Sequence, residues 1–350
     1  MTATEGAIAI ESQDPLRPAA AGVKRRGLGA GTWRQFWLLL GAMALIFFFV
    51  PDPSLKIAML IYGLWAVSLN LLVGYGGLVS FGHALPFGFG AYAAGLLLSE
   101  VTESTWPAWG VAALRMGLLS AFVGAVCLRR TEVYFSMLTL AFAQLGFFIA
   151  LQWRSVTGGD DGLASIPSST LALPWGSVRM SSIGEPDTFF VVTAIVVAVV
   201  FAALILYIDS PLGRVLEAIR ESEERARGCG YNTRAVQLIT FSLAGAVAGL
   251  AGGMYAMLNN FVGLTPYFIL SGTVLIMTIL GGRGSLFGPF IGAAVYLGLE
   301  HELSQRYSNW QLIVGAIFVV CVLAFPQGLW GMVAGSGDRR GLLDLVRLRR

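Results

Sequence analysis

The chain contains three stretches, each about 20 residues long, that lack any charged side chain. They are residues 133–152, 188–208 and 237–257. A helix of this length and apolar character spans the hydrocarbon core of a bilayer. The composition agrees, because 12% of the residues are charged, whereas soluble domains carry about 25%. These stretches predict an integral membrane protein.

Further apolar runs continue along the chain, separated by short polar segments. We therefore expect an all-α polytopic membrane protein with about ten transmembrane or re-entrant helices. Several runs, notably 287–299, are short enough to be half-spans or re-entrant helices. The predicted segments are 35–50, 57–73, 83–99, 108–128, 133–152, 188–208, 237–257, 266–281, 287–299 and 311–325.

The distribution of basic residues predicts the orientation. If the first segment is cytoplasmic and the spans alternate, eighteen Lys and Arg residues fall inside and four outside, namely Lys56, Arg154, Arg179 and Arg306. This bias follows the positive-inside rule and places both termini in the cytoplasm. The expected organisation is a tail at 1–34, a transmembrane domain at 35–330 with an external loop 153–187 and a cytoplasmic loop 209–235, and a basic tail at 331–350.

The cytoplasmic loop reads as one amphipathic helix over 211–228. Ser210 can cap it and Pro211 suits its first turn. Its apolar face is predicted to contain Leu212, Val215, Leu216 and Ile219, and its i,i+4 ion pairs are predicted to be Glu221–Arg225 and Glu223–Arg227. Gly228 and Gly230 would end the helix. A charged loop is usually a solvated connector, but a connector needs only a few residues, so docking to a partner is the second interpretation.

Two glycine-rich breaks interrupt the apolar pattern, at 74–83 and at 281–289. Each has Gly-Gly, then Ser, Gly and Pro, followed by a small-residue helix, which suggests an internal repeat around a midplane pathway. The alternative is a pair of ordinary tightly packed loops. The residues assigned to the pathway are Asn70, Ser80, Gly82, His83, Gln144 and Ser285. A separate set, Gly245, Gly249 and Gly253, predicts close helix packing.

The remaining polar residues give no chemistry of their own. We find no phosphate-binding loop, no nucleophile with a base, and no metal-type spacing of Cys127, Cys229 and Cys321. We therefore expect no catalytic residue, cofactor or metal, and any ATPase would be another polypeptide. Arg115 is a charge within a predicted span, about one third into 108–128, from where it could snorkel outward.

Four stretches together resemble the permeases of branched-chain amino acid ABC transporters, the LivM/LivH family, and the LivM side more closely. They are 74–84 with 88–92, 133–144 with 157–163, 213–221 with 226–230, and 281–289. The resemblance implies a bacterial inner-membrane subunit that works with a second permease, cytoplasmic ATP-binding subunits and an external binding protein, and with no nucleic acid. It also implies that the inner loop couples to the ATPase through Glu217, Ala218, Arg220, Glu221, Gly228 and Gly230.

Two alternatives concern the transport function. Members of the same family carry urea, short amides or other amino acids, so the substrate is less firmly implied than the fold. A self-contained secondary carrier usually needs carboxylates inside the membrane, and Glu132 and Glu300 lie only at span edges. A membrane-embedded enzyme would need a catalytic cluster, which the sequence lacks.

Overall fold

A computed structural model describes residues 30–129, 132–164, 166–167, 169–173, 176–180, 185–263, 267–324 and 328–333. Most of the two predicted tails, 1–29 and 334–350, lies outside these residues. The first helix begins at Ala30, inside the segment 1–34 assigned to the tail. The helix thus starts before the predicted span 35–50 by more than the one or two residues by which helix ends usually differ.

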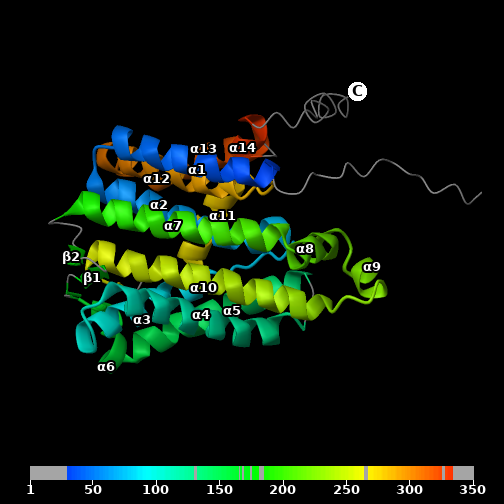
Figure 1. Ribbon diagram of the computed structural model, residues 1–350, viewed down its shortest axis with the longest axis horizontal. Helices are drawn as coiled ribbons and strands as arrows, with labels where there is room; N and C mark the ends of the chain where they lie inside the picture. The colour runs from blue at the N-terminus through cyan, green and yellow to red at the C-terminus, as the bar shows by residue number, and fades with distance from the viewer. Residues whose placement is uncertain are drawn as a thin grey trace, which may run out of the picture.

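Each of the ten predicted apolar segments is a helix. They are α1 (Ala30–Phe49), α2 (Pro53–Asn70), α3 (Ala84–Glu100), α4 (Thr105–Cys127), α5 (Glu132–Gln152), α7 (Pro186–Asp209), α10 (Thr233–Asn259), α11 (Tyr267–Gly281), α12 (Phe287–Arg306) and α13 (Trp310–Ala324). Figure 1 shows the long helices running side by side as one bundle.

Five of these helices are long and apolar enough to cross a membrane by length and composition. They are Pro53–Tyr75, Thr105–Cys127, Val133–Gln152, Pro186–Asp209 and Thr233–Asn259. Three shorter apolar helices accompany them, Trp33–Phe49, Ile269–Gly281 and Trp310–Cys321. The prediction of an all-α polytopic membrane protein is confirmed.

Helix α10 packs against α3 and α4 with very little space between them. A Cβ atom placed on Gly252 would meet the carbonyl of Phe87, and one on Gly249 would lie 2.9 Å from the carbonyl of Ala112. A Cβ atom on Gly245 would collide with the side chain of Ser120. Only glycine allows helices to come this close, so the predicted packing role is confirmed for Gly245 and Gly249. A Cβ atom on Gly253, the third predicted glycine, would lie 3.2 Å from the Cβ of Ala94.

A buried lysine ties α1, α2 and α7 together at one end of the bundle. Lys56 near the start of α2 is 7% exposed. Its Nζ lies 2.6 Å from Oδ1 of Asp187 on α7 and 4.9 Å from the ring centre of Phe47 on α1. An ammonium group out of water needs such partners, and Asp187 keeps part of its carboxylate in solvent.

The two hydrophilic loops lie at opposite ends of the bundle (Figure 1). One end carries α6 (Arg154–Thr157), a 3₁₀ turn (Gly159–Asp161) and an antiparallel hairpin of β1 (Ser169–Leu173) and β2 (Gly176–Met180), which the sequence analysis did not foresee. The other end carries α8 (Pro211–Glu221) and α9 (Glu223–Gly228). The last described helix, α14 (Gly328–Val333), lies toward the α8 end.

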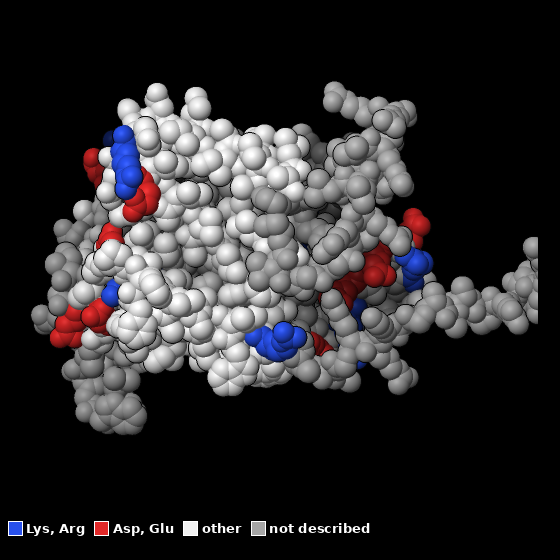
Figure 2. Space-filling view, turned by 90° about the horizontal axis from the view of Figure 1, so that it is seen from above, with Lys and Arg blue, Asp and Glu red and all other residues white. Residues whose placement is uncertain are grey.

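Charge follows the same division. On the face shown in Figure 2, the acidic and basic side chains of the described residues gather at the two ends of the molecule. The surface between them is uncharged except for one basic side chain. An uncharged band between two charged rims is the surface expected of a protein that spans a bilayer.

Candidate functional site

The two glycine-rich breaks meet in the structure, although their contacting residues lie more than 200 positions apart. Asn70 Nδ2 donates a hydrogen bond to the carbonyl of Ser285, at 2.9 Å. A Cβ atom on Gly74 would lie 2.6 Å from the carbonyl of Arg283. Ser285 Oγ in turn accepts from the amide of Gly288, at 3.0 Å. The segments that interrupt the helices therefore support each other in the buried centre.

The first break contains a π-helical turn and an extended segment. The turn, Leu71–Tyr75, continues α2, and Gly77 then reverses the chain with a φ of 70°. Residues 78–83 run back to the start of α3 without regular structure. Non-helical backbone at membrane depth needs partners inside the protein, because its amides and carbonyls cannot bond to lipid.

Helix α5 supplies part of these partners. Ser136 Oγ donates to the carbonyl of Val79, at 2.7 Å, and Thr139 Oγ1 accepts from the amide of Phe81, at 3.3 Å. A Cβ atom on Gly82 would collide with the carbonyl of Thr139. Gly82 is therefore needed for the close approach of residues 78–83 to α5. Ser80 Oγ accepts from the amide of Gly82.

His83, at the end of segment 78–83, forms hydrogen bonds with α2. Ser68 Oγ donates to the carbonyl of Trp65, at 2.6 Å, so its only proton is used. The contact of 2.8 Å between Ser68 Oγ and His83 Nε2 then requires that His83 donates. Trp65 Nε1 donates to the carbonyl of His83, and Ser271 of α11 accepts from the amide of Ala84. His83 is thus held as a packed, hydrogen-bonded residue.

The loop predicted as one helix over 211–228 is two helices, and this prediction was wrong. Ser210 caps α8 as expected, because its Oγ accepts from the amide of Gly213. The helix stops at Glu221, and Ser222 is extended, with φ −164° and ψ 106°. Ser222 Oγ accepts from the amide of Arg225 and starts α9. A serine followed by acidic residues is an N-cap signal that competed with the continuous helix.

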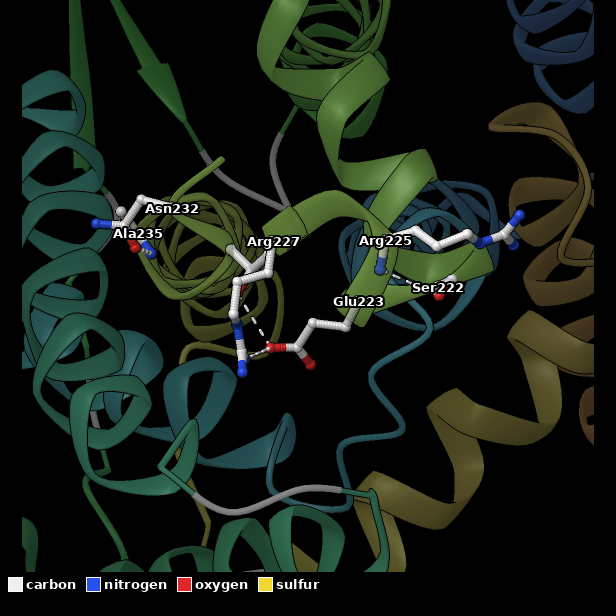
Figure 3. A network of polar contacts seen from close by, with 7 residues as sticks. Ser222, Glu223, Arg225, Arg227, Asn232 and Ala235 are labelled. Carbon is white, nitrogen blue, oxygen red and sulfur yellow. Dashed lines mark hydrogen bonds and ion pairs between the residues drawn. The ribbon is translucent and has the colours of Figure 1, made fainter. Parts of the chain in front are cut away.

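Figure 3 shows the polar network that results. Arg227 Nη2 lies 2.6 Å from Oε1 of Glu223, which also accepts from Thr233 Oγ1 on α10, at 3.0 Å. The side chain of Arg225 points away from this pair. Of the two predicted i,i+4 pairs, Glu223–Arg227 is confirmed. The pair Glu221–Arg225 is wrong because the break at Ser222 separates the two residues.

The apolar face of α8 packs on the bundle in part. Leu216 and Ile219 are buried and Val215 is half-buried, but Leu212 is 40% exposed. Its predicted place on the packed face was wrong, because it lies in the first turn, where α8 leaves α7. Glu217, Ala218 and Glu221 are exposed.

Arg220 of α8 makes a contact that the sequence analysis missed. Its Nη1 donates to the carbonyl of Gly74, in the first glycine-rich break. Its Cγ lies 3.1 Å from the position of a Cβ atom on Gly77. The guanidinium thus joins the exposed helix α8 directly to the break between α2 and α3. Gly77 leaves room for it, because any larger residue would press against the Arg220 stem.

The glycines after α9 differ from each other. Gly230 has a φ of 86°, whereas Gly228 has no positive φ and is the last residue of α9. A positive φ is costly for residues other than glycine. Only Gly230 is therefore required by the backbone.

Three cavities follow α10 from one end of the bundle to the other. The α8-side cavity, about 560 Å³, is lined by Gly77, Val79, Ser136, Arg220 and Gln237 among others. A cavity of about 10 Å³ beside Gly82, His83, Thr139 and Phe241 comes next. The hairpin-side cavity, about 270 Å³, has Tyr62, Phe87, Tyr255 and Asn259 in its wall. The middle one holds at most a single water molecule.

The order of these cavities is set by position on α10. Gln237, Phe241 and Tyr255 border the three cavities in turn, and the distance from the first to the last is about 27 Å along the helix. The segment 78–83 borders the α8-side cavity at Leu78 and Val79 and the middle cavity at Gly82 and His83.

Gln144 is the one predicted pathway residue not yet described. Gln144 of α5 is half-buried and makes no hydrogen bond within the described part of the chain. Asn70, Ser80, His83 and Ser285 are each at most 3% exposed, and their place in a translocation pathway stays a prediction. Among the described residues there is no group of three or more His, Cys, Asp or Glu that could hold a metal ion.

The sequence analysis also missed the side chains that form hydrogen bonds with the backbone of the first glycine-rich break. Ser136, Thr139 and Ser271 lie inside apolar helices, where a hydroxyl commonly bonds to its own helix. Thr139 does so as well, because its Oγ1 donates to the carbonyl of Ser136, at 2.8 Å. The i,i+3 spacing of Ser136 and Thr139 was the available signal.

A helical bundle with an uncharged belt, two facing broken segments and cavities toward both ends of α10 defines a multi-pass membrane transport protein. The chain belongs to the family described as branched-chain amino acid transport system / permease component, which matches residues 54–323.

Three curated relatives illustrate the family. The chain is 31% identical to the high-affinity branched-chain amino acid transport system permease protein LivM of Escherichia coli (strain K12), over 81% of this chain and 72% of that protein. It is 25% identical to LivH of the same organism, over 77% and 91%. It is 24% identical to the probable permease LivM of Methanocaldococcus jannaschii, over 74% and 83%. No solved structure matches the chain.

Proposed function

We propose that this chain is the permease subunit of an ATP-driven importer that moves leucine, isoleucine and valine across a bacterial inner membrane. Support comes from the family match over residues 54–323 and from relatives that are named as branched-chain amino acid permeases. Two types of permease, LivM and LivH, are both similar to this chain, which favours a pair of homologous permeases. The other partners would be cytoplasmic ATP-binding subunits and an external substrate-binding protein.

One observation carries the coupling mechanism, the hydrogen bond from Arg220 to the carbonyl of Gly74. Helix α8 presents Glu217, Ala218 and Glu221 to solvent, where a docked ATPase would contact them. A displacement of α8 would pull on Gly74 through Arg220. Because Gly74 belongs to the break that continues into 78–83, the movement would reach the closed zone between the two larger cavities.

The route of the amino acid would pass that zone. In the proposed cycle, the hairpin-side cavity receives substrate and the α8-side cavity releases it into the cytoplasm. Glycine at positions 74, 77 and 82 keeps the intervening segment thin, so a small shift of the segment could open it. Ser80, His83 and Ser285 then act as supports of the moving backbone, and Gln144 as a pathway residue on α5.

Charge reversal and a milder substitution test the coupling separately. The transporter is reconstituted in vesicles with its ATP-binding subunits, and labelled leucine uptake and ATP hydrolysis are both measured. Glu217→Lys with Glu221→Lys should release the ATP-binding subunits. Arg220→Gln should keep them bound but lower uptake about tenfold or more, because a hydrogen bond from a charged group contributes about 1.5–3 kcal/mol.

Arg214→Gln is the matched control, since Arg214 lies on the same helix and is exposed. It should leave both activities close to those of the unaltered chain. Wild-type uptake and ATP hydrolysis in the Arg220→Gln variant would contradict the coupling role of Arg220. Retention of the ATP-binding subunits by the double charge reversal would show that α8 is only a connector.

The same vesicles separate the alternative functions. Uptake of urea or short amides in preference to leucine would assign the chain to another substrate class of the family. Uptake driven by an ion gradient without ATP would identify a secondary carrier. The described acidic residues lie at helix ends, in the last two turns of α12 or in connecting segments, which disfavours the carrier because ion coupling usually uses carboxylates deeper in the membrane.

A further inference from the structure

Helix α4 places an arginine at mid-depth in the bundle. The helix runs from Thr105 to Cys127, 23 residues, so Arg115 is its eleventh residue. At about 1.5 Å per residue, Arg115 lies about 15 Å from the first residue and about 18 Å from the last. The predicted span 108–128 had put it nearer one end. The three extra residues at the start of α4 place Arg115 nearer the middle of the helix.

The side chain of Arg115 faces outward from the bundle. It is exposed and makes no hydrogen bond or ion pair with any described residue. Its exposed neighbours are apolar, since Leu114, Leu118 and Phe122 are 64%, 65% and 63% exposed. No other charged residue occurs in α4. An isolated charge thus sits in the middle of an apolar surface.

Lipid is a poor cover for this surface. The hydrocarbon core is about 30 Å thick, so Arg115 lies near its centre. A guanidinium on three methylene groups can snorkel to the interface from a helix end, but this stem spans less than half of 15 Å. Charged residues at such depth face another protein segment or water. The face of α4 around Arg115 therefore requires a polar counterpart.

The other exposed residues of this α4 face are suited to packing against a neighbouring helix. Gly110, Leu114, Leu118, Phe122 and Val126 follow one another at intervals of four residues. All five are exposed. Such a row forms a ridge for helix packing. A Cβ atom at Gly110 would meet nothing within 4 Å, so the ridge has a shallow end where a neighbour can approach closely.

We propose that this α4 face, defined by Gly110, Leu114, Arg115, Leu118 and Phe122, is the contact surface for a second, different permease subunit. That subunit would offer Arg115 a carboxylate or the free carbonyls of a broken helix. The inference rests on the proposed function in so far as it assumes a permease pair. A second copy of this chain fits less well, because no described residue presents an exposed carboxylate at mid-depth.

Disulfide cross-linking tests the surface. Cys127, Cys229 and Cys321 are first replaced in the full chain, and Leu118→Cys is then introduced on α4. Val199→Cys on α7, which is 63% exposed and lies at similar depth, is the control. Each variant is co-expressed with the second permease of the same transporter, carrying single cysteines along its spans. Cross-links are expected for Leu118→Cys at one helix of that subunit, and none for Val199→Cys.

The charge is tested by a second set of variants. Arg115→Leu should lower co-purification of the second permease at least fivefold, whereas Arg115→Lys should retain part of it. If lipid covered the face, Arg115→Leu would leave assembly unchanged or improve it, and Leu118→Cys would behave like Val199→Cys. Either result overturns the proposal.

Further outcomes of the cysteine experiments also decide whether a second permease covers the α4 face. Cross-linking of Leu118→Cys between two copies of this chain would replace the proposed partner by a homodimer. Modification of Leu118→Cys by a charged, membrane-impermeant thiol reagent in the assembled transporter would identify a water-filled path instead. Loss of leucine transport alone would concern only the proposed function, because the cross-link reports assembly whatever the substrate is.

Discussion

Individual glycines decide how the centre of this protein is built. Gly82 is the point where residues 78–83 touch the backbone of α5, and Gly288 approaches the carbonyl of Gly281 with 2.8 Å to a Cβ position. At both sites the neighbour is backbone, which cannot rotate away. Even one added methyl group must move a helix.

We predict that Gly82→Ala destabilises the protein and impairs transport. The new Cβ would collide with the Thr139 carbonyl, and overpacking of this kind costs about 1–3 kcal/mol. Thermal unfolding in detergent and uptake in vesicles measure the two effects. Gly272→Ala on α11 is the control, because a Cβ there meets nothing within 4 Å. Equal stability of the two variants would contradict the close contact.

At the level of elements, the helix pair α8–α9 is held on both sides of its junction at Ser222. Arg220 fixes α8 to the first glycine-rich break, and Glu223 with Arg227 and Thr233 fixes α9 to the start of α10. The chain then turns at Gly230 before α10 begins. A force on this pair is therefore passed to the bundle at two defined points.

We predict that Gly230→Val weakens coupling to the ATP-binding subunits. A β-branched residue at a φ of 86° is strained, at a cost of about 1–3 kcal/mol, and relieving that strain would reorient α9. The readout is substrate-stimulated ATP hydrolysis together with co-purification. Gly228→Ala serves as the control, since Gly228 has no positive φ and a Cβ there meets nothing within 4 Å. Full stimulation in the Gly230→Val variant would exclude this role.

The elements also show what a single sequence can reveal. The ten apolar segments were predictable, because a bilayer leaves a charge-free run of this length few options besides a helix. The break at Ser222 depended on a local competition between a cap and a continuing helix. The role of Arg220 was out of reach, since its partner Gly74 lies 146 positions away and a backbone carbonyl leaves no trace in residue type.

The whole molecule has two chemically different ends, and its orientation remains a prediction from the basic residues. Cys229 is exposed beside α9, at the end proposed to be cytoplasmic. Asp161 is exposed at the opposite end, in the loop before the hairpin. A chain that retains only Cys229, and one that carries only Asp161→Cys, report the two sides independently.

We expect an impermeant maleimide to label the Asp161→Cys variant in intact cells and to label Cys229 only after the membrane is opened. The end with α8 and α9 carries more Lys and Arg than the opposite end, and loops rich in these residues stay in the cytoplasm. Labelling after detergent solubilisation shows that both thiols are reactive. The reverse pattern in intact cells would invert the topology and, with it, the proposed site of ATPase docking.

The contact between Asn70 and Ser285 has a consequence for biogenesis. The two residues are 215 positions apart, and at a synthesis rate of about 5–20 residues per second the second one follows the first by roughly 10–40 s. Throughout that interval the amide of Asn70 has entered the membrane without its final acceptor. The first glycine-rich break therefore lacks its contact with the second break until Ser285 has been synthesised. Translation that stops before residue 285 should leave a product that the membrane quality-control proteases recognise and remove.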